Sequence, residues 1–292
     1  MAGNLLTSWT SSKTPGCPVF AGNSLYIHGC VSRTWNRPQK AFRARSDDEV
    51  LDSIRRCGEL YGNQVRRVFL ADGDALVLPT RRLLVYLQAI RHHLPAVHRV
   101  ASYCLPRNLK KKSVGELVAL REAGLALAYV GAESGDDSVL ARVNKGEDFA
   151  STRAALEKLG EAGITRSVMI LNGLGGTALS GQHAENSARL ANATQPEFLS
   201  TLVVSFPLGE TRLRAGFPEW QPLDQAGLFR EMERLLSALE LRRTVFRSDH
   251  ASNWLVLKGT LGADKERLLT QVRQAIAEPQ AAQLRPAWAR GL

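Results

Sequence analysis

The stretch REAGLALAYVGAESGDDSVLARVNKG, residues 121–146, decides the fold class. It opens on the last turn of an amphipathic helix, which Gly124 is placed to stop. The apolar run Leu125–Gly131 follows at once and predicts a buried strand, and the polar loop Glu133–Asp137 comes directly after it. Helix, glycine, strand and polar loop in this order are typical of a parallel β/α unit.

The same unit recurs on both sides of this stretch. Capping boxes at Ser46–Glu49 and Ser113–Glu116 open two helices, and the first of them places Cys57 on its buried face. A helix is also expected over Ala184–Ala193. Six strands are predicted: Ser24–Gly29, Arg66–Ala71, Val97–Cys104, Leu125–Gly131, Ile164–Leu171 and Phe198–Ser205.

Six β/α units predict an α/β fold with a partial or complete parallel β/α barrel, and a doubly wound open sheet is the alternative. The alternation of strands and helices ends at Pro207, and helices are expected after it over Asp224–Glu240 and Asp264–Ala277. The predicted organisation is therefore an N-terminal segment (1–22), a barrel core (23–209), a C-terminal extension packed on the barrel (210–278) and a loosely ordered tail (279–292).

Composition narrows the function classes. The chain has 292 residues and a net charge of +10, from 38 Lys+Arg against 28 Asp+Glu. This charge permits binding to nucleic acid, but the basic residues are dispersed and no nucleic-acid motif accompanies them. No run of about 18 apolar residues predicts a membrane span, and the N-terminus does not resemble a secretory signal. We therefore expect a cytoplasmic protein.

Polar, acidic or glycine-rich loops follow every predicted strand. Active sites of parallel barrels lie at the carboxyl ends of the strands, so this recurrence predicts a site there. Each loop also has a plain structural reading, such as a turn, a solvated charge or a core histidine. The loops are His28–Cys30, Asp72–Asp74, Cys104–Asn108, Glu133–Asp137, Asn172–Gly176 and Ser205–Gly209.

Taken together, these segments resemble the radical S-adenosylmethionine (SAM) superfamily, in the branch of oxygen-independent coproporphyrinogen dehydrogenase and the Elp3-type enzymes. The resemblance runs from about Asn23 to about Ala277, and FRSDHASNWLVLKGTL (246–261) is similar to the tail of an uncharacterised group of the superfamily. The segments that carry it are Gly29-Cys30, FRAR (42–45), RRVFLADGDALVLP (66–79), SYCLPRN (102–108), YVGAESGDDSVLARVNKG (129–146) and ILNGLGG (170–176).

The resemblance implies a [4Fe–4S] cluster held by a CxxxCxxC loop after the first strand. Cys30 stands at the first cysteine position, but Thr34 and Arg37 stand at the other two. One thiolate does not hold such a cluster in the usual way, so a conventional cluster is not expected. Cys104, at the end of the third strand, lies on the same predicted rim and is the other candidate metal ligand beside Cys30.

The resemblance also implies positions that contact SAM. Asp72-Gly73-Asp74 occupies the site that meets the ammonium group, and a carboxylate such as Asp74 suits a cation. Glu133 matches the residue that reaches the ribose or the amino group. The remaining positions border the adenine: Gly173, Gly176, Pro207 and Gly209.

Three functions remain open. The first is a SAM-binding enzyme with altered, non-cluster chemistry, either polar transfer or elimination, with His28, Asp74 and Glu133 as candidate bases. The second is a genuine radical enzyme whose unusual ligands include Cys30 and Cys104, with His28 and Cys17 as further candidates. The third is a non-catalytic scaffold or regulator. The sequence reveals neither the substrate nor the oligomeric state.

Overall fold

The computed structural model describes residues 19–21, 24–28, 45–71, 73–206 and 209–291, with side chains from residue 45 onward. The chain forms two compact units. The N-terminal unit comprises the described residues of Thr10–Val130 and Glu157–Arg166. The C-terminal unit comprises Gly131–Leu156 and the described residues from Ser167 onward. The domain boundaries expected from the sequence stay predictions.

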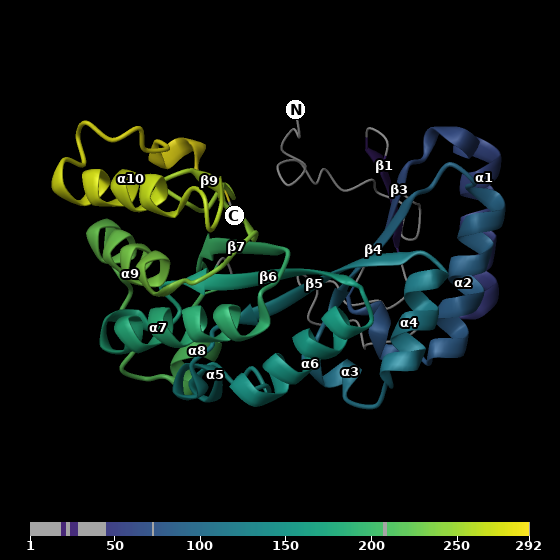
Figure 1. Cartoon of the computed structure of the whole chain (residues 1–292), viewed down its shortest axis with the longest axis horizontal. Coiled ribbons are helices and arrows are strands. Elements are labelled where there is room, and N and C mark those ends of the chain that lie inside the picture. The colour runs from purple at the N-terminus through teal and green to yellow at the C-terminus, as the bar shows by residue number, and fades with distance from the viewer. Residues whose placement is uncertain (1–18, 22–23, 29–44, 72, 207–208, 292) are drawn as a thin grey trace. The chain divides into compact units, whose positions relative to one another are not determined.

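The N-terminal unit alternates strands with helices (Figure 1). Strand β5 (Leu125–Glu133) and helix α6 (Phe149–Glu161) pass from one unit into the other. The other elements are β1 (Val19–Ala21), β2 (Ser24–His28), α1 (Asp47–Tyr61), β3 (Arg67–Ala71), α2 (Thr80–His93), β4 (Arg99–Cys104), α3 (Pro106–Leu109), α4 (Val114–Glu122) and β5 (Leu125–Glu133), with short 3₁₀ helices η1 (Gly62–Gln64) and η2 (Ala75–Val77).

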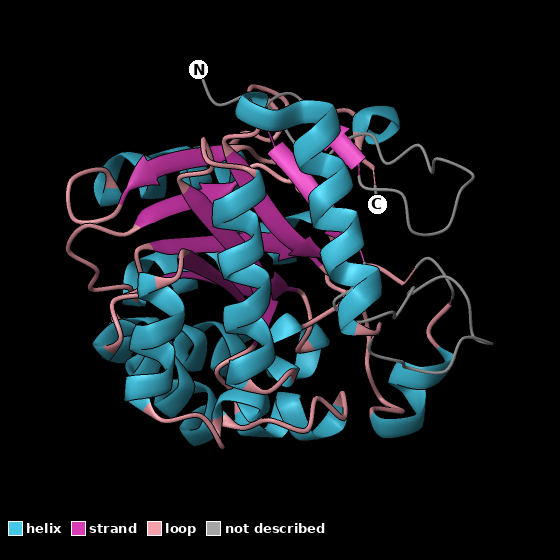
Figure 2. Ribbon diagram, turned by 90° about the vertical axis from the view of Figure 1, so that its right-hand side faces the viewer, coloured by secondary structure: helices cyan, strands magenta, loops and turns pink. Residues whose placement is uncertain are grey.

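Strands β2 to β5 are parallel and follow one another in sequence order, and β1 pairs antiparallel with β2. A doubly wound sheet reverses its strand order at a switch point, and this unit contains no such reversal among its described strands. Helices α1, α2 and α4 lie against one face of the parallel strands (Figure 2). Apolar side chains such as Val68, Val100 and Leu127 are buried, as expected for strands covered by helices.

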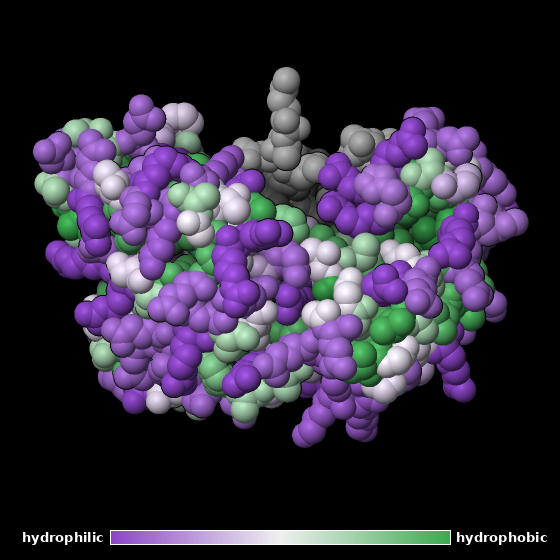
Figure 3. All heavy atoms as spheres, in the orientation of Figure 1, coloured by the Kyte–Doolittle hydropathy of each residue, from purple (hydrophilic) through white to green (hydrophobic). Residues whose placement is uncertain are grey.

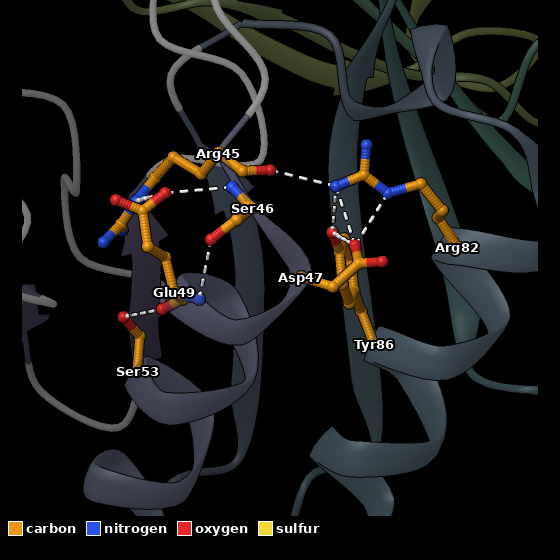
Figure 4. A network of polar contacts seen from close by, with 7 residues as sticks. All are labelled: Arg45, Ser46, Asp47, Glu49, Ser53, Arg82 and Tyr86. Carbon is orange, nitrogen blue, oxygen red and sulfur yellow. Dashed lines mark hydrogen bonds and ion pairs between the residues drawn. The ribbon is translucent and has the colours of Figure 1, made fainter.

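Helix α1 begins at the predicted capping box, where the Ser46 hydroxyl accepts from Glu49 N and the Glu49 carboxylate accepts from Ser46 N. A polar network ties this end of the helix to α2 (Figure 4). Asp47 Oδ1 accepts from Arg82 Nε at 2.7 Å and from the Tyr86 hydroxyl at 2.5 Å. These bonds hold the pKa of Asp47 below its usual value, with the Tyr86 bond the largest cause.

The C-terminal unit carries the second set of β/α elements and the C-terminal helices (Figure 1). Its elements, besides the ends of β5 and α6, are α5 (Asp137–Arg142), β6 (Thr165–Asn172), α7 (Gly176–Thr194), β7 (Phe198–Val203), α8 (Thr211–Gly216), α9 (Gln225–Ala238), β8 (Val245–Ser248), β9 (Leu257–Thr260), α10 (Lys265–Ala277) and the 3₁₀ helix η3 (Ala287–Ala289).

Strands β6, β7 and β8 are parallel, and β9 pairs antiparallel with β8. Strand β8 was not predicted, because four residues of mixed polarity give no clear period. Helix α7 begins at Gly176 rather than at the predicted Ala184. The glycines of the segment Asn172–Gly176 were interpreted as a loop. In the structure Gly176 is the first residue of the helix, with φ +59°.

Parallel strands in sequence order confirm the predicted α/β class. Within the described part of the chain, no helix has both the length and the hydropathy that a membrane span requires. Hydrophilic side chains cover much of the face seen in Figure 3, in keeping with a composition that is 23% charged. The predicted tail contacts the C-terminal unit, because Arg285 and Arg290 donate to backbone carbonyls of residues 249–253.

Candidate functional site

The carboxyl edge of the C-terminal unit gathers three loops. Because β6, β7 and β8 are parallel, the loops that follow them leave the sheet at the same edge. These loops contain Gly173, the segment Val204–Phe206 and the segment Asp249–Asn253. Glu133, the last residue of β5, belongs to the same unit.

A cavity of about 250 Å³ opens between the loops after β6 and β7. Gly173 and Val204 border it from the strand side. Trp220 and Leu223 border it from the segment that leads into α9, and Leu228 borders it from α9 itself. The Phe206 ring, which also lines the cavity, meets the Trp220 ring edge to face with centroids 5.5 Å apart. The walls are therefore mainly apolar and aromatic, as in pockets that take flat organic rings.

The glycine loop after β6 is held from two directions. The Trp220 indole Nε1 donates to Leu174 O at 3.1 Å, and a Cβ on Gly176 would lie 2.8 Å from Trp220 Cδ1. From the other direction the buried carboxylate of Glu231 accepts from Gly173 N at 2.6 Å. Gly173 has φ +84°, a conformation that favours glycine. The loop is thus built around absent side chains and fixed by two residues from the C-terminal elements.

Glu133 has an unusual backbone conformation at the end of β5. Its φ is +64°, in the left-handed region that costs a residue with a Cβ about 1–2 kcal/mol. Its Oε1 pairs with Lys145 Nζ at 2.8 Å, and the two side chains are 22% and 16% exposed. Asn144 and Gly146 on either side of Lys145 also have positive φ, so the NKG segment makes a tight turn that presents Lys145.

The residues after Glu133 are anchored to α7. The Ser134 hydroxyl lies 2.8 Å from His183 Nδ1, and the same hydroxyl accepts from Asp136 N. Gly135 N donates to Ser187 Oγ at 3.0 Å. These buried bonds fix the backbone on which Glu133 sits.

Two buried titratable groups lie behind this edge. Burial lowers the pKa of His183 to about 4, which keeps its ring neutral near pH 7. Burial raises the pKa of Glu231 to about 7, and the bonds from Ser180 and Gly173 oppose that rise. His183 Nε2 and Glu231 Oε1 are 3.9 Å apart, too far for a hydrogen bond.

His250 is a functional candidate that the sequence reasoning missed. Its Nδ1 accepts from Ser252 N at 3.1 Å and lies 2.9 Å from Ser252 Oγ. Asn253 and Ser252 both accept from Val203 N at the end of β7, so the loop caps the same strand whose end lines the cavity. The only signal in the sequence was the similarity of residues 246–261 to the tail of an uncharacterised protein group, and that similarity assigned no role to His250.

Asp74 and Cys104 lie together at the carboxyl edge of the N-terminal unit. Asp74 Oδ2 accepts from Leu105 N at 2.5 Å and from Asn108 Nδ2 at 2.7 Å, while Oδ1 accepts from Leu76 N at 2.8 Å. Burial raises the pKa of Asp74 in spite of these bonds. The carboxylate thus ties the loops after β3 and β4 to each other.

The described part of the chain offers no preformed metal site. Cys57 and Cys104 are buried, and no group of three or more His, Cys, Asp or Glu residues is arranged to hold a metal among the residues with described side chains. Cys57 lies on the buried face of α1, as predicted. Cys17, Cys30, Asp72 and Pro207 lie outside the described residues, and only the backbone of His28 is described.

The predicted site residues fall in both units. Gly73 and Asp74 lie in the N-terminal unit with Cys104. The C-terminal unit contains Glu133 and the three glycines Gly173, Gly176 and Gly209, the last with φ +85°. Gly173 lines the cavity and Gly176 contacts Trp220 beside it. A single rim shared by all of these residues stays a prediction.

Parallel strands in sequence order, with polar and glycine-rich loops at their carboxyl ends, define the class of β/α barrel proteins. Within that class the chain belongs to the radical SAM superfamily, since the superfamily's model matches residues 17–191, more than half of the sequence. The fold of this superfamily is a partial parallel β/α barrel. None of the curated proteins compared with the sequence matches it.

Several solved structures are similar to this chain. Coproporphyrinogen III oxidase from Escherichia coli, titled a radical SAM enzyme, is 16% identical with a TM-score of 0.50 over 65% of this chain and 45% of its own. Methylornithine synthase is 15% identical with a TM-score of 0.50 over 85% and 67%. An archaeal Elp3 from Methanocaldococcus infernus is 12% identical with a TM-score of 0.49 over 79% and 58%. The chain thus spans less than half of the coproporphyrinogen oxidase.

Proposed function

We propose that this chain binds SAM at the carboxyl edge of the C-terminal unit, with the adenine in the cavity beside Gly173. The single observation that carries the proposal is that cavity, which opens between the β6 and β7 loops and is lined by Trp220 and Phe206. Membership of the superfamily implies SAM binding and enzymatic activity. The cavity supports this location for the adenine.

The size and chemistry of the cavity suit a purine. A volume of about 250 Å³ is below the roughly 300–1,000 Å³ of pockets that enclose a whole drug-sized ligand, so it suits one ring system. Aromatic walls stack on a purine, and the polar residues Ser205 and Glu210 are also among the lining residues. Gly173 leaves room for close approach because it has no side chain.

Glu133 and Lys145 provide the polar end of the proposed site. A carboxylate accepts from ribose hydroxyls or an ammonium group, and a lysine attracts a carboxylate. Glu133 and Lys145 already form an ion pair at 2.8 Å. The ammonium and carboxylate groups of a bound amino acid moiety would therefore replace the partner of each side chain. The strained backbone of Glu133 is consistent with a functional constraint on its position.

The cluster fits this chain poorly. The family's loop needs three thiolates, and the sequence supplies Cys30 alone at that spacing, with Thr34 and Arg37 in the other places. Cys104 is buried against its own loop, with Sγ 3.7 Å from Leu105 O. We therefore propose altered, non-cluster chemistry, either polar transfer or elimination at the sulfonium, in which the protein supplies orientation and a base.

Glu133 is the candidate base that this geometry favours, because its side chain keeps some exposure and its carboxylate pairs with Lys145. Asp74 already uses both carboxylate oxygens within the fold. His28 stays a candidate on sequence grounds. The substrate is a small molecule of unknown identity, nucleic acid is a possible partner without a motif, and a cytoplasmic location stays a prediction.

Calorimetry with S-adenosylhomocysteine, the stable analogue of SAM, tests the proposal. Leu223 borders the cavity, so Leu223→Trp should fill it and weaken binding at least about tenfold. Leu60→Trp is the matched control, because Leu60 is 68% exposed on α1 of the other unit. Equal affinity in the wild type and Leu223→Trp would remove the cavity from the site. Absence of binding in the wild type would favour the non-catalytic alternative.

Anaerobic reconstitution with iron and sulfide tests the chemistry. We expect no broad visible absorbance of a [4Fe–4S] cluster, and no 5′-deoxyadenosine when dithionite and SAM are added. Binding of about four irons, lost in Cys30→Ala or Cys104→Ala, would instead establish the radical enzyme with unusual ligands. Ser102→Ala is a control for Cys104→Ala, since Ser102 is a buried residue of the same strand.

A further inference from the structure

Glu231 is a buried carboxylate in the middle of helix α9, and it accepts hydrogen bonds from the glycine loop and from Ser180 of α7. Its Oε1 accepts from Gly173 N at 2.6 Å and its Oε2 accepts from Ser180 Oγ at 2.6 Å. The side chain is 1% exposed. One carboxylate therefore joins α9, the start of α7 and the loop that borders the cavity.

Burying an ionisable group without a cationic partner is costly, so the position calls for an explanation. A glutamine would also accept from a backbone N–H, and an apolar residue would pack between the two helices. What a carboxylate adds is a stronger hydrogen bond to the loop when it is ionised, and a weaker one when it carries a proton.

We propose that Glu231 is a positioning residue whose ionisation tightens the Gly173 loop around a bound adenosine, so that adenosine affinity depends on the proton at this carboxylate. The inference rests on the proposed function, because it assigns the adenosine to the cavity that Gly173 borders. Glu231 does not line that cavity and acts through Gly173.

The surroundings make Glu231 the group that titrates near neutral pH. Burial raises its pKa to about 7. From α7 it faces His183, which burial keeps neutral with its pKa at about 4. Behind His183, the pKa of Asp136 lies below its usual value because of bonds from Val139 N, Asn186 and Gln182.

Charges on the neighbouring helices are engaged elsewhere. On α9 itself Glu233 pairs with Arg273 of α10 at 2.8 Å, and Arg234 lies 3.8 Å from Glu185 of α7. From α10, Lys265 donates to carbonyls at the end of α9. Arg230, the remaining charged residue of this part of α9, is exposed.

Calorimetry over pH 5.5 to 8 with 5′-methylthioadenosine tests the inference. This probe is the nucleoside part of SAM without its amino acid end, so it brings no group that titrates in this range. Glu231→Gln keeps an acceptor for Gly173 N but carries no charge at any pH. Glu233→Gln is the matched control on the same helix, and its side chain is 33% exposed.

In the wild type and in Glu233→Gln the dissociation constant should rise about fivefold between pH 8 and pH 5.5, the difference between a charged and a neutral hydrogen bond. In Glu231→Gln it should stay constant and match the low-pH value. By linkage, binding to the wild type should release protons near pH 7. A purely structural role predicts a lower melting temperature in the variant but the same pH profile, and that outcome would overturn the inference.

A second measurement needs no ligand. The amide signal of Gly173, followed by NMR, should shift with a midpoint near the pKa of about 7 in the wild type and stay still in Glu231→Gln. An amide that does not titrate overturns the inference. If the amide titrates but no nucleoside binds at any pH, the proposed function fails while the coupling between Glu231 and the loop holds.

Discussion

Asp74 and Glu133 are both acidic residues near the carboxyl end of a strand, and both were predicted to contact SAM, yet their environments differ. Asp74 is 8% exposed and accepts three hydrogen bonds from two loops of the N-terminal unit. Glu133 holds a strained backbone conformation and pairs with Lys145 while remaining partly exposed. The Asp74 carboxylate stabilises the loops around it. The backbone conformation of Glu133, in contrast, costs free energy that neighbouring contacts must offset.

The comparison teaches how to separate a structural carboxylate from a functional one. A carboxylate whose oxygens accept backbone N–H groups satisfies donors that would otherwise be buried unpaired. A residue kept at positive φ without being glycine costs free energy that other contacts must offset, and such strain clusters at functional sites. The contrast therefore predicts opposite effects of mutation on stability at the two positions.

Asp74→Ala should have the largest effect. It leaves the donors of Leu76, Leu105 and Asn108 without their acceptor, so we expect the free energy of unfolding to fall by about 3–5 kcal/mol. Urea unfolding at pH 7 measures the loss. Asp48→Ala is a matched control, because Asp48 is exposed on α1.

If Asp74 also holds the SAM ammonium, the affinity of the folded variant should fall as well, by about 1.5–3 kcal/mol. A variant as stable as the wild type but weaker in binding would break the comparison. It would show that Asp74 serves the ligand rather than the loops.

Glu231 lies between the two cases, and pH separates its contributions. Its folded pKa of about 7 exceeds the ordinary value of 4.5, so the folded state binds more protons between these values. The free energy of unfolding should therefore fall as the pH rises from about 4.5 to about 7, by up to about 3 kcal/mol. Glu231→Gln should remove this fall. Urea unfolding of both proteins at pH 5 and pH 8 measures the difference, and parallel curves would contradict it.

Glu133→Gly should stabilise the protein while weakening binding. Glycine removes the cost of the positive φ, about 1 kcal/mol, and the loss of a partly exposed ion pair offsets about half of that gain. Affinity for S-adenosylhomocysteine should fall about tenfold with the loss of a charged acceptor. Glu133→Asn tolerates the same φ and separates strain from charge. A lower free energy of unfolding in Glu133→Gly would show that Glu133, like Asp74, stabilises the fold.

The sequence predicted the regular part of the fold because its signals are local. The capping boxes at Ser46 and Ser113 set the starts of α1 and α4, and glycines after helices set the starts of β5 and β6 within a residue or two. The start of α7 and strand β8 were missed. Their signals depend on contacts, since Gly176 begins a helix where the Trp220 indole covers it.

The site was predicted in part for the same reason. Glu133 and Gly173 lie at the carboxyl ends of β5 and β6, so their positions could be expected from the alternation of strands and helices alone. The sequence reasoning missed three residues that lie more than forty residues beyond the end of β6: Trp220, Glu231 and His250. Their roles arise from the packing of α9, the segment before it and the loop after β8, which no local pattern specifies.

Lys145→Met should have the smallest effect and tests what holds Glu133 in place. Ser134, Gly135 and Asp136 are bonded to each other and to α7, so the backbone at Glu133 is fixed without the lysine. A partly exposed ion pair contributes about 0.5–1 kcal/mol at most, and methionine preserves the apolar stem of the lysine. We therefore expect a loss of stability below about 1 kcal/mol and a binding of 5′-methylthioadenosine equal to that of the wild type.

S-adenosylhomocysteine, which carries a carboxylate, should bind to Lys145→Met a few-fold more weakly than to the wild type if Lys145 attracts that group. If instead both ligands lose affinity as strongly as in Glu133→Gly, the ion pair and not the anchored backbone positions Glu133, and the contrast with Asp74 no longer rests on strain.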